Sequence, residues 1–166
     1  MARAWLSLGS NIQPQHYLAA ALNHLRSRFG VVVESPWYRT RAVGFDGPEF
    51  INLAAAVESD LDPVELDAWL HALESQHARD RTQPRFGSRT LDIDIVLYDD
   101  RVIEGPGNLR IPRAELRHGF VLRPLSDLAP DLVPPDGDAR TLIQRWRDLE
   151  EDERASVELF AHAHAD

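Results

Sequence analysis

Two aspartates separated by one residue are the side chains in this sequence best suited to hold a divalent cation. The run Arg89-Thr90-Leu91-Asp92-Ile93-Asp94-Ile95 has the period-two alternation of a strand, so its aliphatic side chains face a core and both carboxylates face the other side. The rise of a strand separates Asp92 from Asp94 by about 7 Å at Cα. Neighbouring carboxylates repel one another unless a cation lies between them, and oxygen-only ligands suit Mg²⁺. A solvated strand face is the alternative interpretation of this pattern.

Arginines gather in the sequence on both sides of the aspartate pair. The two groups are Arg79, Arg81, Arg85 and Arg89, and Arg110, Arg113, Arg117 and Arg123. Guanidinium groups bind phosphate through forked donors, often together with a metal ion. The combination indicates a nucleoside triphosphate held by Mg²⁺ on one side and by arginine on the other. A purely structural network of ion pairs is the alternative.

A second set of side chains, nearer the N-terminus, suits a planar heterocycle. Thr40, Gly44, Phe50 and Asn52 combine small, aromatic and amide groups, and Phe50 and Asn52 alternate on one strand so that they share its face. An aromatic ring stacks on a planar ligand, and an amide recognises its donor and acceptor edges. Packing into the core is the alternative interpretation of Phe50.

The elements that must position these residues follow a β-α-β-β-α-β order. Strands are expected at 4–8, 31–38, 50–57 and 90–98, and helices at 14–29 and from Asp62 to about His77. Short strands at 101–103 and 109–111, partly helical structure at 114–128 and a last helix at 141–149 would follow. The acidic run Glu150 to Glu153 and the histidine-containing tail are expected to fray. This order predicts an α+β, ferredoxin-like sandwich with a C-terminal extension, in one domain spanning 1–166 whose tail from about residue 150 is peripheral.

Composition excludes several functional classes. The 166 residues include no cysteine, which rules out a disulfide scaffold, a thiolate zinc site and cysteine catalysis. The sequence has no apolar run of about 18 residues and no secretion signal, so we expect a cytoplasmic protein without a membrane partner. A formal net charge of −9 argues against a nucleic-acid partner, which would require a basic surface.

The run from Arg85 to Val96 resembles the signature of the 6-hydroxymethyl-7,8-dihydropterin pyrophosphokinase family of the folate pathway. It has a basic residue, a glycine, a small residue, an arginine, two further residues, Asp-x-Asp and an aliphatic pair in the family's order. Other stretches agree in the same order, and the resemblance extends to about Gly137. They are Leu8-Gly9-Ser10-Asn11, Tyr38-Arg39-Thr40, Phe50-Ile51-Asn52, Glu74, Phe120-Val121-Leu122 and Pro124-Leu125.

The resemblance implies a reaction, its ligands and the residues that hold them. ATP would donate its β,γ-pyrophosphoryl unit to the hydroxymethyl group of 6-hydroxymethyl-7,8-dihydropterin and release AMP, and the chain would act as a monomer. Two Mg²⁺ ions would be held by Asp92 and Asp94. The positions implied for ATP and its phosphates are Arg79, Arg81, Arg85, Arg89, Arg113, His118, Glu74, Ile95 and Arg110. Those implied for the pterin are Thr40, Val43, Gly44, Phe50, Asn52, Phe86 and Phe120.

Four positions depart from the family pattern. Arg113 stands where the family has histidine, and His118 stands where it has arginine. Asn108 replaces a usual arginine, Thr82 replaces a frequent lysine, and the loop around Ala114 is a residue shorter. These departures leave the aspartate pair unchanged and concern ATP affinity and turnover. A weakly active paralogue that binds pterin or ATP is therefore an alternative function, and a ferredoxin-like RNA-binding module, which needs a basic face, is a more distant one.

Overall fold

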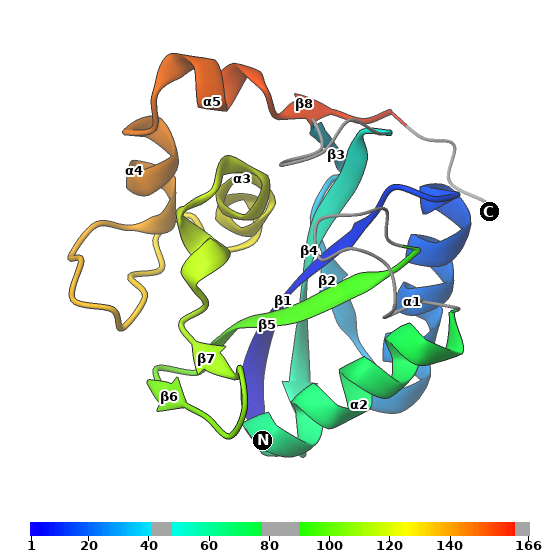
Figure 1. The fold of residues 1–166 in the computed structure, drawn as a ribbon. Helices are drawn as coiled ribbons and strands as arrows, with labels where there is room; N and C mark the ends of the chain where they lie inside the picture. Colours follow the sequence, from blue (N-terminus) through cyan, green and yellow to red (C-terminus); the bar gives the residue numbers. More distant parts are fainter. Residues whose placement is uncertain (41–47, 78–89, 162–166) are drawn as a thin grey trace.

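An antiparallel sheet of six strands, with β1 between β4 and β5, is the framework of this computed structural model, which describes residues 1–40, 48–77 and 90–161 (Figure 1). The strand order is β5-β1-β4-β3-β8, and β2 also pairs with β4. The strands are β1 (Ala2–Ser10), β2 (Val32–Glu34), β3 (Tyr38–Thr40), β4 (Phe50–Ser59), β5 (Asp92–Tyr98) and β8 (Glu158–Leu159). The order of β5, β1, β4 and the β2–β3 edge is that of a ferredoxin-like sandwich, so the predicted fold class is confirmed.

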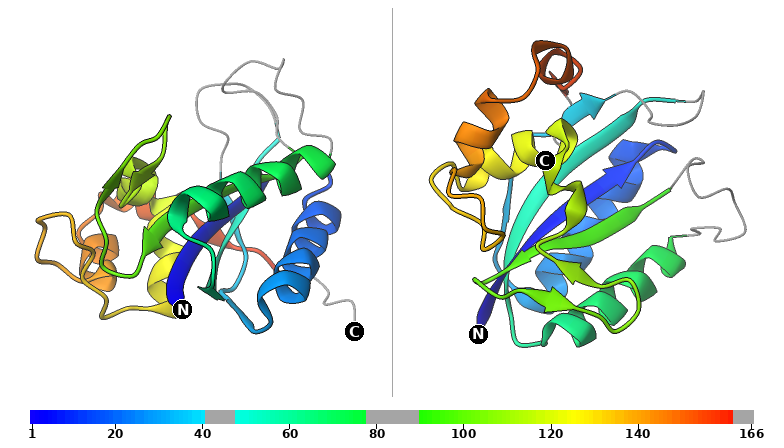
Figure 2. Two further views of the ribbon diagram at one scale, coloured as in Figure 1. Left: turned by 90° about the horizontal axis from the view of Figure 1, so that it is seen from below. Right: turned by 60° about the vertical axis from the view of Figure 1, so that its left-hand side comes forward.

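Two helices cover one face of the sheet and enclose the larger core. They are α1 (Pro14–Phe29) and α2 (Pro63–Gln76), and Figure 2 shows both on the same side of the strands. Leu18 and Leu25 of α1 and Leu66 of α2 are fully buried against strand residues such as Ile93. A capping box between Asp62 and Glu65 begins α2, as the sequence predicts. The apolar side of β5 therefore faces these helices.

The other face of the sheet is packed against α3 (Gly119–Leu128), and α4 (Leu142–Arg147) packs against α3 in the same core. A 3₁₀ turn, η1 (Ala114–Arg117), precedes α3, and β6 (Ile103–Glu104) and β7 (Arg110–Ile111) form a separate two-stranded sheet. Trp5 of β1 and Val96 of β5 contribute to this second core, and both lie near the N-terminal end of β1. Gly9, at the other end of β1, is on this same face.

The strand expected at 31–38 is two short strands. β2 and β3 both pair with β4, and Ser35, Pro36 and Trp37 lie between them. Pro36 has no N–H to give to a ladder, and the Ser35 hydroxyl instead accepts the N–H of Ala54 at 2.9 Å. The edge of the sheet is therefore bent at Pro36 and continues to Thr40.

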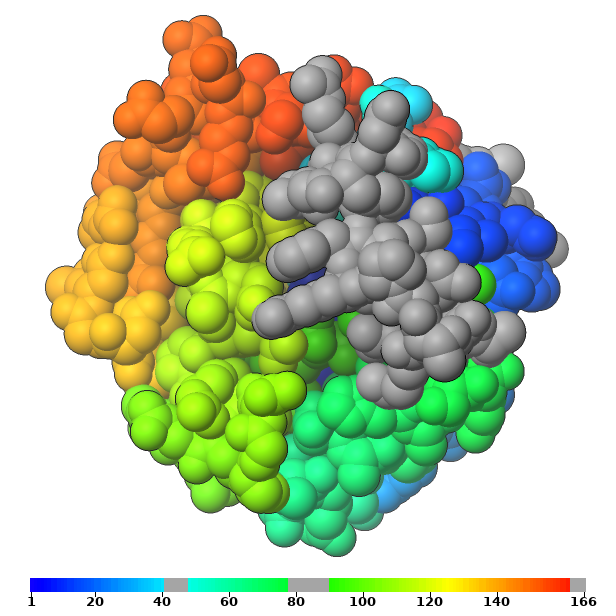
Figure 3. Space-filling view, in the orientation of Figure 1, coloured from blue at the N-terminus to red at the C-terminus, as the bar shows by residue number. Residues whose placement is uncertain are grey.

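The expectation that Glu150 to Glu153 would fray is wrong. Helix α5 (Glu151–Ala155) and strand β8 follow α4, and β8 pairs antiparallel with β3. Figure 3 shows these segments, in orange and red, lying directly against the yellow-green surface of α3 and the residues that precede it. No helix within the described ranges is long and apolar enough to cross a membrane.

Candidate functional site

Three antiparallel strands bring predicted metal and pterin residues to one end of the sheet. Gly9 of β1 pairs with Asn52 of β4 on one side and with Asp92 of β5 on the other. Ser7, two residues earlier, pairs with Asp94. Because side chains alternate along a strand, the amide and both carboxylates point to the face opposite α1 and α2. Residues far apart in the sequence thus form one surface.

A guanidinium group faces the second aspartate. Nη2 of Arg113 lies 3.3 Å from Oδ1 of Asp94, and both side chains are 25% exposed. Nε of the same arginine lies 3.1 Å from Oε2 of Glu115. The backbone N–H of Arg113 donates to the carbonyl of Val96 at 3.0 Å, which fixes the start of η1 to β5. The arginine that replaces the family's histidine is therefore paired with a predicted metal ligand.

The acidic pair fits a cation that substrate phosphates also hold. Asp92 and Asp94 are half-buried and offer only oxygen, the donor that Mg²⁺ prefers. Within residues 1–40, 48–77 and 90–161, no group of three or more His, Cys, Asp or Glu could hold a metal ion. Mg²⁺ is commonly bound by one or two carboxylates together with water and phosphate oxygens. Two carboxylates are thus sufficient as the protein's share of such a site.

Asn52 is held in place from two sides. Its side chain is 6% exposed, and its Nδ2 donates to the hydroxyl of Thr40 at 2.9 Å. A Cβ added at Gly9 would lie 2.6 Å from Oδ1 of Asn52, so only glycine leaves room for this amide. Phe50 pairs with Thr40 across β3 and β4 and is half-buried. The predicted pterin residues of the two strands are therefore close together.

The first turn of α3 carries two more predicted residues. The rings of His118 and Phe120 are stacked, with centroids 5.3 Å apart and an interplanar angle of 11°. His118 precedes the helix, and its side chain makes no capping hydrogen bond. Gly119 lies between these two residues in the sequence, and its N–H donates to Oε1 of Glu153 at 2.9 Å. No motif pointed to Glu153, which is 34 residues away in the sequence.

Three predicted ATP residues are placed differently from the others. Ile95 is 1% exposed and packs in the core on the α1–α2 face, so its side chain points away from the side of Asp94. Glu74 is fully buried within α2. Arg110 is exposed on β7, and its Nη1 donates to the carbonyl of Leu109 at 3.0 Å. The other predicted positions, Arg79, Arg81, Arg85, Arg89, Val43, Gly44 and Phe86, lie outside the described residues.

A polar cluster that the sequence analysis did not single out connects β3 to α3. The hydroxyl of Tyr38 donates to Oδ2 of Asp127 and accepts from Nε of Arg123 at 3.0 Å. Burial, followed by the hydrogen bond to Asp127, raises the pKa of Tyr38. The sequence points to Tyr38, in the motif Tyr38-Arg39-Thr40, and to Arg123, in the second arginine group, but not to Asp127. The cluster holds α3 against the strand that carries Thr40.

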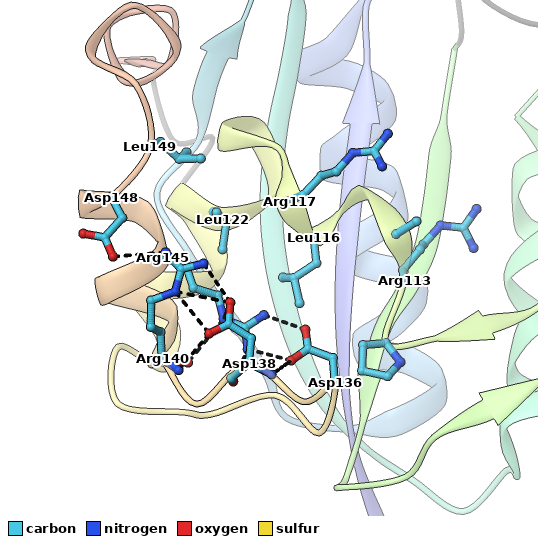
Figure 4. A pocket seen from close by; sticks show the side chains of 12 residues that line it. Arg113, Leu116, Arg117, Leu122, Asp136, Asp138, Arg140, Arg145, Asp148 and Leu149 are labelled. Carbon is cyan, nitrogen blue, oxygen red and sulfur yellow. Dashed lines mark hydrogen bonds and ion pairs between the residues drawn. The ribbon is translucent and has the colours of Figure 1, made fainter.

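A pocket of about 480 Å³ opens between η1 and the segment before α4 (Figure 4). Arg145, 8% exposed, contacts both carboxylate oxygens of Asp136 at 2.6 and 2.8 Å, which lowers the pKa of that aspartate. Arg140 forms ion pairs with Asp138 at 2.7 Å and with Asp148 at 3.0 Å. Figure 4 shows the side chains of Arg113 and Arg117 pointing away from this network. The arginines within the network are therefore neutralised by their own aspartates.

The fold, together with the sheet end that carries Asn52, Asp92 and Asp94, defines a ferredoxin-like α+β protein with a paired-carboxylate site beside a buried amide. Residues 5–130 match the sequence model of the family described as 7,8-dihydro-6-hydroxymethylpterin-pyrophosphokinase (HPPK). The chain belongs to this family, which confirms the resemblance found in the sequence.

Similar proteins support the same assignment. A protein of Pseudomonas aeruginosa is 39% identical over 140 residues, covering 81% of this chain and 85% of the relative. One of Synechocystis is 39% identical over 145 residues, covering 85% and 73%. Both are named 2-amino-4-hydroxy-6-hydroxymethyldihydropteridine pyrophosphokinase. Among solved structures, wild-type Plasmodium falciparum HPPK-DHPS with SDX-DHP has a TM-score of 0.68 at 15% identity, and the match covers 89% of this chain but only 43% of that one. This last likeness concerns the fold alone.

Proposed function

We propose that this chain transfers the pyrophosphoryl group of ATP to the hydroxymethyl group of 6-hydroxymethyl-7,8-dihydropterin. The hydroxymethyl oxygen would form a bond to the β-phosphorus, the bond from that phosphorus to the α,β-bridging oxygen would break, and AMP would leave. The hydroxyl proton would pass to solvent. The proposal includes action as a cytoplasmic monomer with no nucleic-acid or membrane partner.

The observation that carries this proposal is the shared sheet end of Asn52, Asp92 and Asp94. Gly9 pairs with both Asn52 and Asp92, so a heterocycle bound at the amide lies beside the carboxylates. Transfer of a phosphoryl group depends on positioning and charge neutralisation more than on covalent help from the protein. An arrangement that holds acceptor and triphosphate side by side therefore supplies what this reaction requires.

The residues of the chain have separable roles in this proposal. Asn52 binds the polar edge of the pterin, and Phe50 and Phe120 contact its ring. Asp92 and Asp94 would hold the Mg²⁺, which neutralises charge on the triphosphate when it is bound. Arg113, whose Nη2 faces Asp94, donates to a phosphate oxygen through its guanidinium group.

Incubation with ATP, MgCl₂ and the reduced pterin alcohol tests the proposal. We expect AMP and the pterin diphosphate in equal amounts, and no AMP when either MgCl₂ or the pterin is omitted. Asp92→Ala and Asp94→Ala should abolish AMP formation while circular dichroism shows the fold unchanged. Near-normal turnover by either variant would contradict the assignment. Binding of ATP and pterin without AMP formation would favour a weakly active paralogue.

A further inference from the structure

The last 30 described residues are attached to the rest of the molecule next to the proposed substrate site. They lie beyond residues 5–130, the part that matches the family. β8 pairs with β3, with Leu159 opposite Tyr38 and Glu158 opposite Arg39. The N–H of Phe160 also donates to the carbonyl of Trp37 at 2.9 Å. This attachment is to the strand that carries Thr40.

A second attachment is made by the side chain of Glu153 in α5. Its Oε1 accepts the N–H of Gly119, the first residue of α3, at 2.9 Å. The first N–H groups of a helix have no partner within it, and they carry partial positive charge. Because the side chain of His118 makes no capping hydrogen bond, the carboxylate of Glu153 supplies an acceptor from elsewhere in the chain.

Gly119 also packs tightly against these residues. A Cβ added there would lie 3.2 Å from Val157, 3.3 Å from Trp146 and 3.4 Å from Glu153. Glycine thus allows the backbone of α3 to approach the C-terminal residues. His118 and Phe120, whose rings are stacked, are the residues on either side of Gly119 in the sequence.

We propose that Glu153 is a positioning residue for the proposed substrate site, acting through Gly119. By fixing the first turn of α3, it sets the rings of His118 and Phe120 relative to Asn52 and Thr40. It touches neither carboxylate of the metal pair among the described contacts, and of the two rings Phe120 is the one assigned to the pterin, so we expect its effect on pterin binding to act through Phe120. The inference rests on the proposed function.

The test compares Glu153→Ala and Glu153→Gln with the wild-type full chain. We expect the Kd of the reduced pterin alcohol, measured calorimetrically in the presence of MgCl₂ and a non-hydrolysable ATP analogue, to rise about tenfold for Glu153→Ala, as for loss of one charged hydrogen bond. Glu153→Gln keeps an acceptor oxygen and should recover most of this affinity. Binding of Mn²⁺ to the nucleotide-free protein should be the same in all three proteins.

Two control variants separate positioning from general loosening. Glu151→Ala removes an exposed carboxylate from the same short helix and should leave the pterin Kd unchanged. Thr141→Ala removes the capping box of α4 and should lower the melting temperature without raising the pterin Kd.

An unchanged pterin Kd in Glu153→Ala would overturn the inference, as would an equal rise in Thr141→Ala. If Glu153→Ala does not fold, Glu153→Asp takes its place, because its shorter side chain withdraws the carboxylate from the N–H of Gly119. A pterin Kd in Glu153→Asp equal to that of Glu151→Ala would then overturn the inference. Failure of the wild-type chain to produce AMP while the variants still differ in pterin binding would overturn the proposed function and leave this inference standing.

Discussion

Arg113 occupies a position where it would compete with a metal ion for the carboxylate of Asp94. Its guanidinium lies between Asp94 and Glu115, at 3.3 and 3.1 Å, and is only one quarter exposed. An arginine keeps its charge at any accessible pH, unlike a histidine. Where the family has histidine, this chain therefore has a permanent cation beside a proposed metal ligand. Metal binding must displace that cation or share the carboxylate with it.

Arg113→Ala should tighten metal binding in the absence of nucleotide. Removing a cation a few ångströms from Asp94 removes a repulsion that we expect to be worth roughly tenfold in Kd. Titration calorimetry with MnCl₂ measures it, with Arg117→Ala as the matched control because Arg117 ends the same turn without an ion pair to Asp94 among the described residues. Glu115→Gln should have the opposite effect, because Arg113 then pairs with Asp94 alone. Equal Mn²⁺ affinity in all four proteins would show that this ion pair does not compete with metal.

Gly9→Ala should weaken pterin binding without unfolding the protein. The new methyl group would lie 2.6 Å from Oδ1 of Asn52, so the side chain that moves is the amide proposed to bind the pterin. A misplaced amide leaves a buried polar edge of the ligand unpaired, at a cost of about 1–3 kcal/mol. Calorimetry should give a similar loss of pterin affinity for Gly9→Ala and Asn52→Ala, and little change for ATP. An equal loss for ATP in either variant would argue against separate pterin and phosphate sites.

At the scale of elements, His77 ends α2 where this helix meets α1. Its ring lies edge-on to those of Tyr17 and His24, at 5.8 and 5.4 Å, and its Nε2 is buried with no hydrogen-bond partner among the described residues. Burial, and to a lesser degree charge on His24 and His16, lowers the pKa of His77 below 6.5. The folded protein thus accommodates His77 better when it is neutral.

This lowered pKa predicts that stability falls as the solution becomes acidic. The unfolded chain takes up a proton near pH 6.5 and the folded chain only at lower pH. The contribution to stability is therefore fully present above pH 6.5 and is lost progressively as the pH falls from there through the lowered pKa of the folded state. His77→Gln cannot be protonated, and its melting temperature should fall less between about pH 7.5 and 5.5. Parallel curves for the two proteins would show that His77 does not account for the acid sensitivity.

The elements that sequence predicts well are those with a long apolar period. Both helices on the larger core and the face of Asp92 and Asp94 follow from periodicities of 3.6 and 2. The interruption at Pro36 and the helix and strand after Glu150 depend on tertiary contacts, and such contacts override local propensity. The bond from Gly119 to Glu153 spans 34 residues, and no local pattern specifies it.

Some features of the candidate site likewise follow from the sequence pattern, and others depend on tertiary contacts. That Asn52 and Phe50 share a face is a consequence of alternation alone. The pairing of Arg113 with Asp94 depends instead on how η1 docks on β5, through the bond to Val96. The sequence therefore predicts which strand face a residue occupies, whereas the pairing of a given cation with a given carboxylate depends on tertiary contacts.

At the scale of the whole molecule, the net charge of −9 is the basis for our expectation that this chain does not bind nucleic acid. A polyanion is repelled by such a chain unless basic groups gather on one face, and arginines such as Arg140 and Arg145 are paired with aspartates. We expect the protein to pass through a heparin column without retention at low salt. Retention that is released by a salt gradient would favour the RNA-binding alternative.

Because Gly9 pairs with Asn52 on one side and with Asp92 on the other, the sheet fixes the distance between two parts of the proposed substrate site. Adjacent strands in any sheet are spaced at 4.7–4.9 Å, so the backbones at Asn52 and Asp92 are about 10 Å apart, with only β1 between them. Hydrogen bonds between main chains set this interval, and it does not change when loops differ in length or sequence. A slip of one residue between β1 and either neighbour would turn an amide or a carboxylate to the opposite face. In the proposed site, the span from a heterocycle at Asn52 to phosphates at Asp92 is thus a dimension of the backbone.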